Sequence, residues 1–187
     1  MADGDMKVQP KCQWPVTSPD APSTEYLHKG GVLRGKGKFQ PVEYRPPFEL
    51  EDAEYPLVLS TGRTLYHYNA ATQTRRSEGL SAKQPEGFVE IHPKNARKLG
   101  VQDGQMVDVV TRRSRVKARA MVSRQVRYNR IWMPFHFPEM RTNELTVDAG
   151  DAVTGTGEYK VCAARLEPVP ESVPERVFPG AFAAAEG

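Results

Sequence analysis

Residues 106–122, MVDVVTRRSRVKARAMV, decide the fold class of this chain. Two runs in which apolar and polar residues alternate flank the polar residues 112–114, a pattern typical of two antiparallel strands joined by a tight turn. In the second run Arg115, Lys117 and Arg119 alternate with small apolar residues, as expected for a strand with one buried and one solvated face. We therefore interpret the basic residues as a solvated strand face, and not as a surface that binds nucleic acid.

Further short strands are expected on both sides of this hairpin. Pro93 suits the first turn of a short helix, and Gly100 is expected to end it. A chain with about six short strands and only one or two helices belongs to the mainly β class, and closure into a barrel would remove exposed strand edges. The sequence therefore predicts a closed six-stranded β-barrel, with the remaining strands at residues 57–59, 88–92, 131–134 and 159–166.

Sixteen prolines, most of them near the two ends, divide the chain into three parts. Because proline removes a backbone donor and fixes φ, proline-rich segments are expected to be extended chain and turns. We expect residues 1–54 to form an extended proline- and glycine-rich lead-in that packs on a partner. Residues 55–168 are expected to form the barrel, and residues 169–187 a flexible tail.

Composition excludes several classes of protein. With 187 residues, 39% hydrophobic residues and a net charge of +3, the chain is expected to be globular, and its charge is too mild to indicate nucleic acid. No apolar run approaches the length of a membrane helix, and the acidic start has no apolar segment behind it, so a cytoplasmic location is expected. The distant Cys12 and Cys162 cannot by themselves hold an iron–sulfur cluster or a zinc ion.

The loop that follows the strand at 57–59 is the first candidate binding site. Gly62 would let backbone amides approach an anion, and the Arg63 guanidinium can bind a phosphate through two hydrogen bonds. Hydroxyl and aromatic side chains follow directly, which suits a phosphorylated heterocycle. Alternatively, the glycine only makes a turn, the arginine pairs with a surface acid, and His67 is a core histidine with its hydrogen bonds satisfied.

Two later loops are weaker candidates. The strand at 131–134 runs into aromatic residues and a polar loop, which would place His136 and Asn143 at a barrel mouth. An asparagine amide can donate to and accept from the edge of a heterocycle. Glu158 and Lys160, near the last strand, could meet a purine edge and a phosphate. An aromatic core patch and solvated charges remain the alternative interpretations of these residues.

No motif of a complete enzyme accompanies these loops. The chain has no Gly-x-Ser-x-Gly elbow, no phosphate-loop lysine motif and no metal-like spacing of its four histidines. The residues by themselves therefore indicate a binding domain more readily than a complete enzyme.

A set of short segments occurs in a specific order along the chain: RGKGKF (34–39), YRPP (44–47), YPLVLSTGR (55–63), VEIHP (89–93), MPFHF (133–137), NELT (143–146) and EYKVCA (158–163). In this order and spacing they resemble the C-terminal region of the catalytic (alpha) subunit of molybdenum- or tungsten-dependent formate dehydrogenases, in the molybdopterin oxidoreductase family. Tyr128 and Asn129 stand where that family has a Pro-Gly turn. Since asparagine tolerates positive φ, we expect Asn129 to preserve the turn.

The resemblance implies a double-psi form of the six-stranded barrel and a bis-(molybdopterin guanine dinucleotide) cofactor with molybdenum or tungsten. It implies no catalytic residue and no metal ligand in this chain, since the cofactor carries the chemistry and the protein positions it. The residues that it implies as cofactor contacts are Thr61, Gly62, Arg63, Thr64, His67, Tyr68, His136, Asn143, Glu144, Glu158, Tyr159 and Lys160.

The resemblance also implies partners. In that family the metal ligand and the cysteines of an iron–sulfur cluster lie in earlier domains, so this chain would complete the site of a larger catalytic chain, with further electron-transfer subunits, and would be inactive alone. It could be a separate subunit or a C-terminal portion. Two alternatives stay open: a subunit of a related enzyme such as formylmethanofuran dehydrogenase, or a non-catalytic cofactor-insertion or binding module.

Overall fold

The computed structural model describes residues 14–15, 18, 26–32, 35–170 and 175. Cys12 and most of the predicted tail lie outside the described residues. The chain divides into two units, residues 1–45 and residues 46–187, so the structure groups residues 46–54 with the barrel. In the first unit the described residues form no helix or strand, and Phe39 and Tyr44 are 98% and 85% exposed. Among the described residues, no helix is long and apolar enough to cross a membrane.

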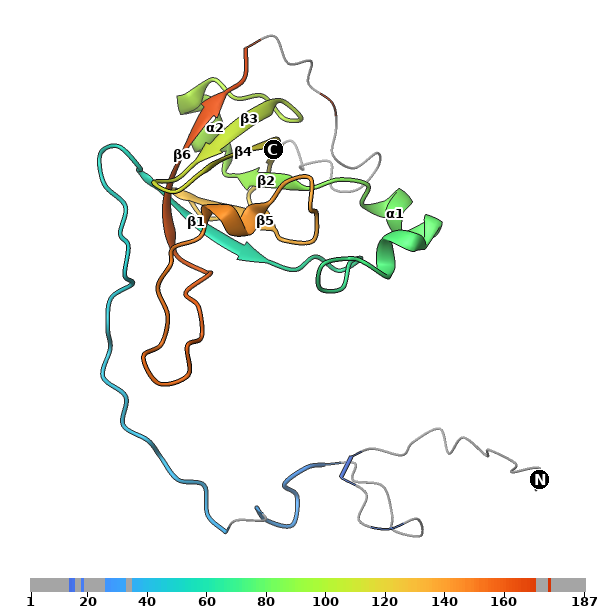
Figure 1. Cartoon of the computed structure of the whole chain (residues 1–187), viewed down its shortest axis with the longest axis vertical. Coiled ribbons are helices and arrows are strands. Elements are labelled where there is room, and N and C mark those ends of the chain that lie inside the picture. The colour runs from blue at the N-terminus through green and yellow to red at the C-terminus, as the bar shows by residue number, and fades with distance from the viewer. Residues whose placement is uncertain (1–13, 16–17, 19–25, 33–34, 171–174, 176–187) are drawn as a thin grey trace, which may run out of the picture. The chain divides into compact units, whose positions relative to one another are not determined.

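The second unit is a closed six-stranded barrel, as predicted (Figure 1). Around the barrel the strands follow the order β1-β5-β2-β4-β3-β6. The pairs β1–β5 and β2–β4 are parallel and the other four pairs are antiparallel. The strands are β1 (Leu57–Gly62), β2 (Phe88–Ile91), β3 (Met106–Val110), β4 (Arg115–Val122), β5 (Arg130–Pro134) and β6 (Cys162–Pro168), and the helices are η1 (Thr74–Arg76), α1 (Glu78–Lys83), α2 (Pro93–Leu99) and η2 (Thr142–Leu145).

The barrel interior is filled by the inward residues of each strand. Leu59, Val89 and Ile131 have no exposed surface, and small side chains such as Ala118 and Ala120 face them from β4. Alternation of large and small side chains lets strands from opposite sides of a small barrel pack closely. The core therefore comes from the period-two pattern that is visible in the sequence.

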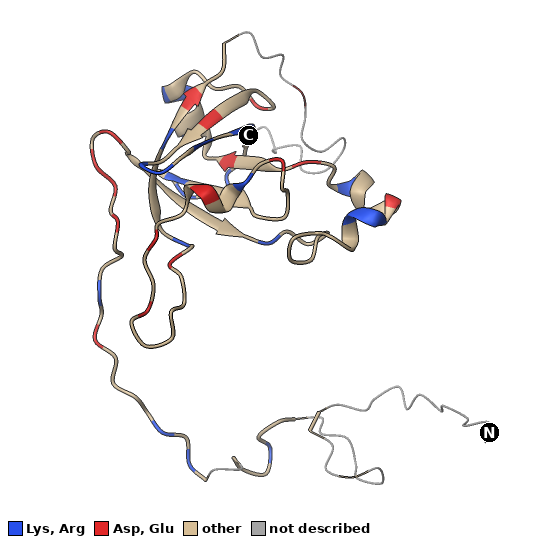
Figure 2. Cartoon of the chain, in the orientation of Figure 1, with Lys and Arg blue, Asp and Glu red and all other residues tan. Residues whose placement is uncertain are grey.

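The predicted hairpin is present, and acids on neighbouring strands neutralise part of its basic face. Arg115 pairs with Asp108 at 2.9 Å and with Glu167 at 2.5 Å, and Lys117 pairs with Asp108 at 3.1 Å. Figure 2 shows acidic and basic segments beside one another on these strands. The arginines at the hairpin turn, in contrast, are not simply solvated, as described below.

Local signals set the ends of the elements. The His92 side chain accepts a hydrogen bond from the Lys94 amide at the start of α2, and Gly100 ends the helix with φ 68°. Asn129 has φ 60°, so the prediction that it preserves a turn before β5 is confirmed. β6 begins at Cys162 and not at residue 159 as expected, because the residues before it bind the end of β1.

Candidate functional site

The predicted loops meet at one end of the barrel. β1 and β5 are parallel and in register from Val58 with Arg130 to Gly62 with Pro134, so their carboxyl ends lie side by side. β6 runs the opposite way, and its start, Cys162, pairs with Leu59. The loop after β1, the loop after β5 and the loop before β6 therefore share one edge of the barrel.

The loop after β1 presents a guanidinium group to solvent. Arg63 donates a hydrogen bond to the side-chain oxygen of Asn69 at 2.7 Å, and its guanidinium lies over the rings of Tyr68 and Phe135 at 5.5 and 5.7 Å. Tyr68 itself is 64% exposed. An arginine held by an amide and two rings, yet exposed, is suited to bind an anion.

His136 holds this loop in place. The imidazole is completely buried, its Nε2 accepts a hydrogen bond from the Thr64 amide at 2.8 Å, and its Nδ1 donates to the carbonyl of Asn69. This pattern requires the neutral tautomer with the proton on Nδ1. Burial lowers the pKa of His136; the bond to the Asn69 carbonyl acts in the opposite direction, and the charges of His67 and Arg63 lower it further.

His67 is also occupied by the protein. Its Nε2 donates to the backbone carbonyl of Gln84 at 2.8 Å, and its Nδ1 lies 3.0 Å from the hydroxyl of Thr74. The side chain is 4% exposed. Both histidines therefore join the loop after β1 to neighbouring segments, and neither ring has a free nitrogen for a ligand.

The loop before β6 closes over the end of β1. The Thr61 hydroxyl donates to the carbonyl of Tyr159 at 2.8 Å, and the Lys160 ammonium donates to the carbonyl of Thr61. Glu158 accepts from the Phe48 amide at 3.2 Å. Lys160 also lies 5.9 Å from the ring of Phe135, so two cations, Lys160 and Arg63, approach the same aromatic side chain.

Gly62 permits a close contact between β1 and β5. A β-carbon at this position would lie 2.8 Å from Nε1 and 2.9 Å from Cζ2 of Trp132, which is closer than real contacts allow. The glycine is therefore required by the Trp132 indole, and φ at this position is not in the left-handed region.

Asn143 and Glu144 lie on η2, beyond the end of β5. The hydroxyl of Thr142 donates to the carbonyl of Pro134 at 2.7 Å, which ties η2 to that strand. Asn143 and Glu144 are exposed, and Glu144 accepts from Arg141 at 3.1 Å. These two residues are anchored to the loop cluster through the backbone of β5, while their side chains face solvent.

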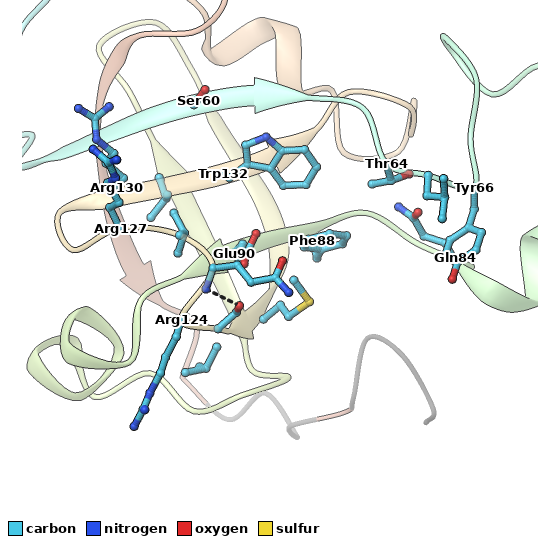
Figure 3. A pocket seen from close by; sticks show the side chains of 17 residues that line it. Ser60, Thr64, Tyr66, Gln84, Phe88, Glu90, Arg124, Arg127, Arg130 and Trp132 are labelled. Carbon is cyan, nitrogen blue, oxygen red and sulfur yellow. Dashed lines mark hydrogen bonds between the residues drawn. The ribbon is translucent and has the colours of Figure 1, made fainter. Parts of the chain in front are cut away.

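Sequence reasoning did not single out a groove on the outer face of β5 and β2 (Figure 3). It has a volume of about 930 Å³, and of the predicted site residues only Thr64 lines it. Its wall includes Trp132, Phe88 and the buried side chain of Gln84. Gln84 lies four positions before β2, between Lys83 and Pro85, and nothing in that stretch of sequence signals that its side chain is buried.

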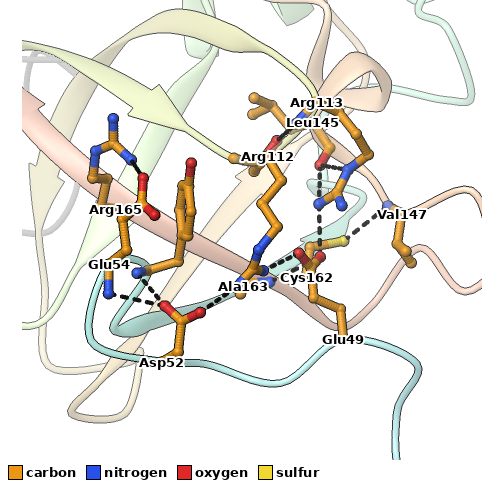
Figure 4. Close-up of polar contacts among 12 residues, drawn as sticks. Glu49, Asp52, Glu54, Arg112, Arg113, Leu145, Val147, Cys162, Ala163 and Arg165 are labelled. Atoms are coloured by element: carbon orange, nitrogen blue, oxygen red, sulfur yellow. Dashed lines mark hydrogen bonds and ion pairs between the residues drawn. The ribbon is translucent and has the colours of Figure 1, made fainter.

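A second feature that the sequence did not reveal is a carboxylate clamp formed by Glu49, Arg112 and Arg113 (Figure 4). Glu49 is 8% exposed and accepts from both arginines, at 2.7 Å from Arg113, and from the Ala163 amide at 3.3 Å. Burial alone would raise the pKa of Glu49, but the hydrogen bonds from Arg113 and Arg112 outweigh it and lower the pKa. The clamp fastens residues before β1 to the β3–β4 turn and to β6.

The donors at this end of the barrel suit a phosphorylated heterocycle. Arg63 and Lys160 supply positive charge, the Asn143 amide is exposed, and the buried hydroxyl oxygen of Thr64 has no hydrogen-bond partner among the described residues. A pyrophosphate requires several fixed donors, which loops on a rigid barrel can supply. No group of three or more potential metal-ligating side chains occurs in the part of the chain that the structure describes.

Comparison with known proteins identifies relatives of this chain. The molydopterin dinucleotide binding domain family matches residues 57–163. F420-dependent formate dehydrogenase 2 subunit alpha of Methanococcus maripaludis is 45% identical over 84% of this chain and 24% of its own length, and the corresponding alpha subunit of Methanocaldococcus jannaschii is 40% identical over 82% and 23%. The assimilatory nitrate reductase catalytic subunit of Bacillus subtilis is 32% identical over 89% and 24%.

The chain thus spans about a quarter of the length of the curated relatives it matches. Among solved structures, acetylene hydratase from Pelobacter acetylenicus matches 68% of this chain and 21% of its own, with a TM-score of 0.61 and 20% sequence identity. At this identity the structural likeness supports the fold, and the barrel is shared with a much larger enzyme.

Proposed function

The chain belongs to the molydopterin dinucleotide binding domain family, and we propose that it completes the cofactor site of a formate dehydrogenase catalytic chain. The similarity to formate dehydrogenase alpha subunits, at 40–45% identity, is the observation that supports this enzyme over its relatives. The chain would be the C-terminal portion of the catalytic chain, or a separate subunit equivalent to it. Formylmethanofuran dehydrogenase and nitrate reductase are the competing enzymes.

The cofactor in this proposal is bis-(molybdopterin guanine dinucleotide), in a double-psi barrel. When bound, it supplies the two-electron redox chemistry that interconverts formate and carbon dioxide at a molybdenum or tungsten ion. Arg63 and Lys160 would bind its phosphates, and Asn143 and Glu144 would meet a heterocycle edge. Thr61, Gly62, Thr64 and Tyr159 would shape the loops, with Tyr68 and Glu158 at their margins.

His67 and His136 have a different role in this proposal. Because both ring nitrogens of each histidine bind the protein itself, they would position the loop after β1 and would not touch the cofactor. Neutral His136 keeps the Thr64 amide in place, and His67 joins the loop to the segment before β2. They are positioning residues for Arg63.

The remaining parts of the enzyme would come from elsewhere. A larger chain would carry the metal ligand and an iron–sulfur cluster, and this chain alone would be inactive. The similar alpha subunits are described as F420-dependent, so F420 is a reasonable electron acceptor to test. We place the assembled enzyme in the cytoplasm. The exposed aromatic residues Phe39 and Tyr44 of the lead-in would be covered by the larger chain.

The experiment isolates the complex anaerobically from its host and measures molybdenum, tungsten and pterin content in wild type, Arg63→Ala and Lys160→Met. Loss of cofactor from both variants, with Lys98→Ala on α2 as an unaffected control, supports the proposed site. Formate oxidation with F420 or a viologen, compared with nitrate reduction and formylmethanofuran oxidation, decides the enzyme. Full cofactor content in both variants, or a chain isolated without a larger partner, would refute the proposal.

A further inference from the structure

The groove on the outer face of β5 and β2 is distinct from the loop cluster. Glu90 and Trp132 are opposite each other in the antiparallel pair and line the groove, while their neighbours Val89 and Met133 belong to the core. Figure 3 shows Trp132, Phe88 and Glu90 along the wall, with Thr64 and Gln84 at one end and Arg127 and Arg130 at the other. The groove therefore has a polar end, an aromatic wall and a basic end.

Several polar atoms of the groove are buried without hydrogen-bond partners among the described residues. The Gln84 side chain is 1% exposed, and neither its Oε1 nor its Nε2 has a hydrogen-bond partner among the described residues. Glu90 is 8% exposed; its carboxyl group accepts from the Ser123 hydroxyl and the Val126 amide, and Oε1 is left without a partner. Since unsatisfied buried polar atoms are costly, a cluster of them beside one cavity indicates a ligand that would satisfy them.

The other surfaces of the groove suit a ligand that has a planar ring and a phosphate group. The rings of Phe88 and Trp132 lie 5.7 Å apart, and Tyr66 adds a third ring to the lining. Within the described part of the chain, neither Arg127 nor Arg130 forms an ion pair, so their charge is available to a phosphate. A volume of about 930 Å³ is large enough for a mononucleotide.

We propose that this groove binds an oxopurine nucleoside monophosphate, with the base between the aromatic wall and Gln84 and the phosphate on Arg127 and Arg130. A side-chain amide offers one donor and one acceptor in the same plane, which matches the adjacent N–H and C=O of an oxopurine ring. An adenine edge could also pair with an amide, so the discrimination comes from Glu90, which lines the groove and whose Oε1 has no hydrogen-bond partner among the described residues. This carboxylate oxygen can accept from the ring N–H of an oxopurine, whereas adenine has a lone pair at that ring position and would be disfavoured. The inference is independent of the proposed function, because it concerns free nucleotide and this chain alone.

The chain offers a built-in fluorescent reporter. Its two tryptophans are Trp14 and Trp132, so Trp14→Phe leaves the groove residue as the sole tryptophan. Titration of this full-length variant with GMP should give a saturable change in Trp132 emission, with a Kd below about 1 mM. AMP should bind at least about tenfold more weakly, and guanosine should bind more weakly than GMP because it lacks the phosphate.

Two variants test the contacts separately. Gln84→Met removes both amide atoms with little change in shape; it should weaken GMP binding about tenfold or more while the thermal midpoint stays equal or rises, because no hydrogen bond is lost. Arg127→Gln combined with Arg130→Gln should weaken GMP binding and leave guanosine binding unchanged. Arg97→Gln on α2, outside the groove, is the matched control and should bind as the parent does.

Several results would overturn the proposal. A constant Trp132 emission up to about 5 mM GMP excludes a useful nucleotide site and leaves the groove as a surface for protein. Equal affinity for GMP and AMP refutes recognition of the oxopurine edge, and unchanged GMP binding in Gln84→Met refutes recognition by the amide. Equal affinity for GMP and guanosine refutes the role of the two arginines.

Discussion

Replacement of His136 by alanine tests whether a buried imidazole holds the loop after β1. The substitution removes the hydrogen bonds to the Thr64 amide and the Asn69 carbonyl, each worth about 1 kcal/mol of net stability. It also leaves a cavity where a completely buried ring stood, which costs about 1–2 kcal/mol more. We expect a loss of about 3–4 kcal/mol in the free energy of unfolding near pH 8, measured by urea denaturation.

The pH dependence separates this role from simple packing. Protonation of Nε2 would turn an acceptor into a donor facing the Thr64 amide, so the folded state holds His136 neutral and its pKa is lowered. The unfolded chain, in contrast, binds a proton near the ordinary pKa of 6.5. Stability therefore falls as the pH drops below that value, and if the folded state binds no proton, lowering the pH from about 8 to about 5.5 removes about 1.4 kcal/mol.

When the free energy of unfolding of wild type and variant is compared at each pH, the contributions of all other titrating groups cancel. The stability difference between wild type and His136→Ala should shrink by up to about 1.4 kcal/mol between these two pH values. His136→Gln, which keeps an acceptor for the Thr64 amide and does not titrate, should recover part of the stability without this pH dependence. A difference between wild type and His136→Ala that stays constant with pH would refute the assignment of a neutral, acceptor Nε2.

Two further predictions concern the clamp and the contact between β1 and β5. Glu49→Gln keeps the shape of the clamp but removes its charge; it should cost about 2 kcal/mol at neutral pH in urea denaturation, and because the pKa of Glu49 is lowered, the difference from wild type should vanish as the pH falls through the acidic range. Asp52→Asn is the control, because Asp52 is an exposed partner of Arg112. An equal loss of stability in both variants would contradict the stabilising role of the buried Glu49 carboxylate. Gly62→Ala should destabilise the barrel by about 1–3 kcal/mol and alter Trp132 emission, because the indole must move. Gly79→Ala in α1, where a β-carbon meets nothing within 4 Å, should not destabilise it, and equal thermal midpoints for the two alanine variants would refute the contact.

The strands and the barrel could be predicted because their cause is local. Alternation along residues 106–122 and 88–91 places Val107, Val109 and Val89 inside, and the structure has them without exposed surface. Gly100 and Asn129 likewise adopt positive φ where turns were expected. The pairing of β1 with β5 and β6 could not be derived from these patterns, because it joins segments that are far apart along the chain.

The roles of single side chains were harder to predict. His67 and His136 looked like ligand-binding residues, but their partners are backbone carbonyls and an amide whose positions depend on the complete fold. Glu49 lies in a proline-rich stretch that gave no sign of a buried charge, and only the folded chain brings it to Arg112 and Arg113. Composition shows which residues could bind a ligand, and tertiary structure determines which are free to do so.

The position of β1 has a consequence for the order of folding. β1 is the first strand of the barrel, yet both of its partners, β5 and β6, come last along the chain. During synthesis it stays unpaired until β5, which begins at Arg130, has emerged, and the barrel cannot close until residues near Cys162 follow; each pairing must overcome the entropy of a long loop. The three loops at the end of the barrel therefore form together and late, so a truncation that removes β6 would abolish the closed barrel and the loop cluster at the same time.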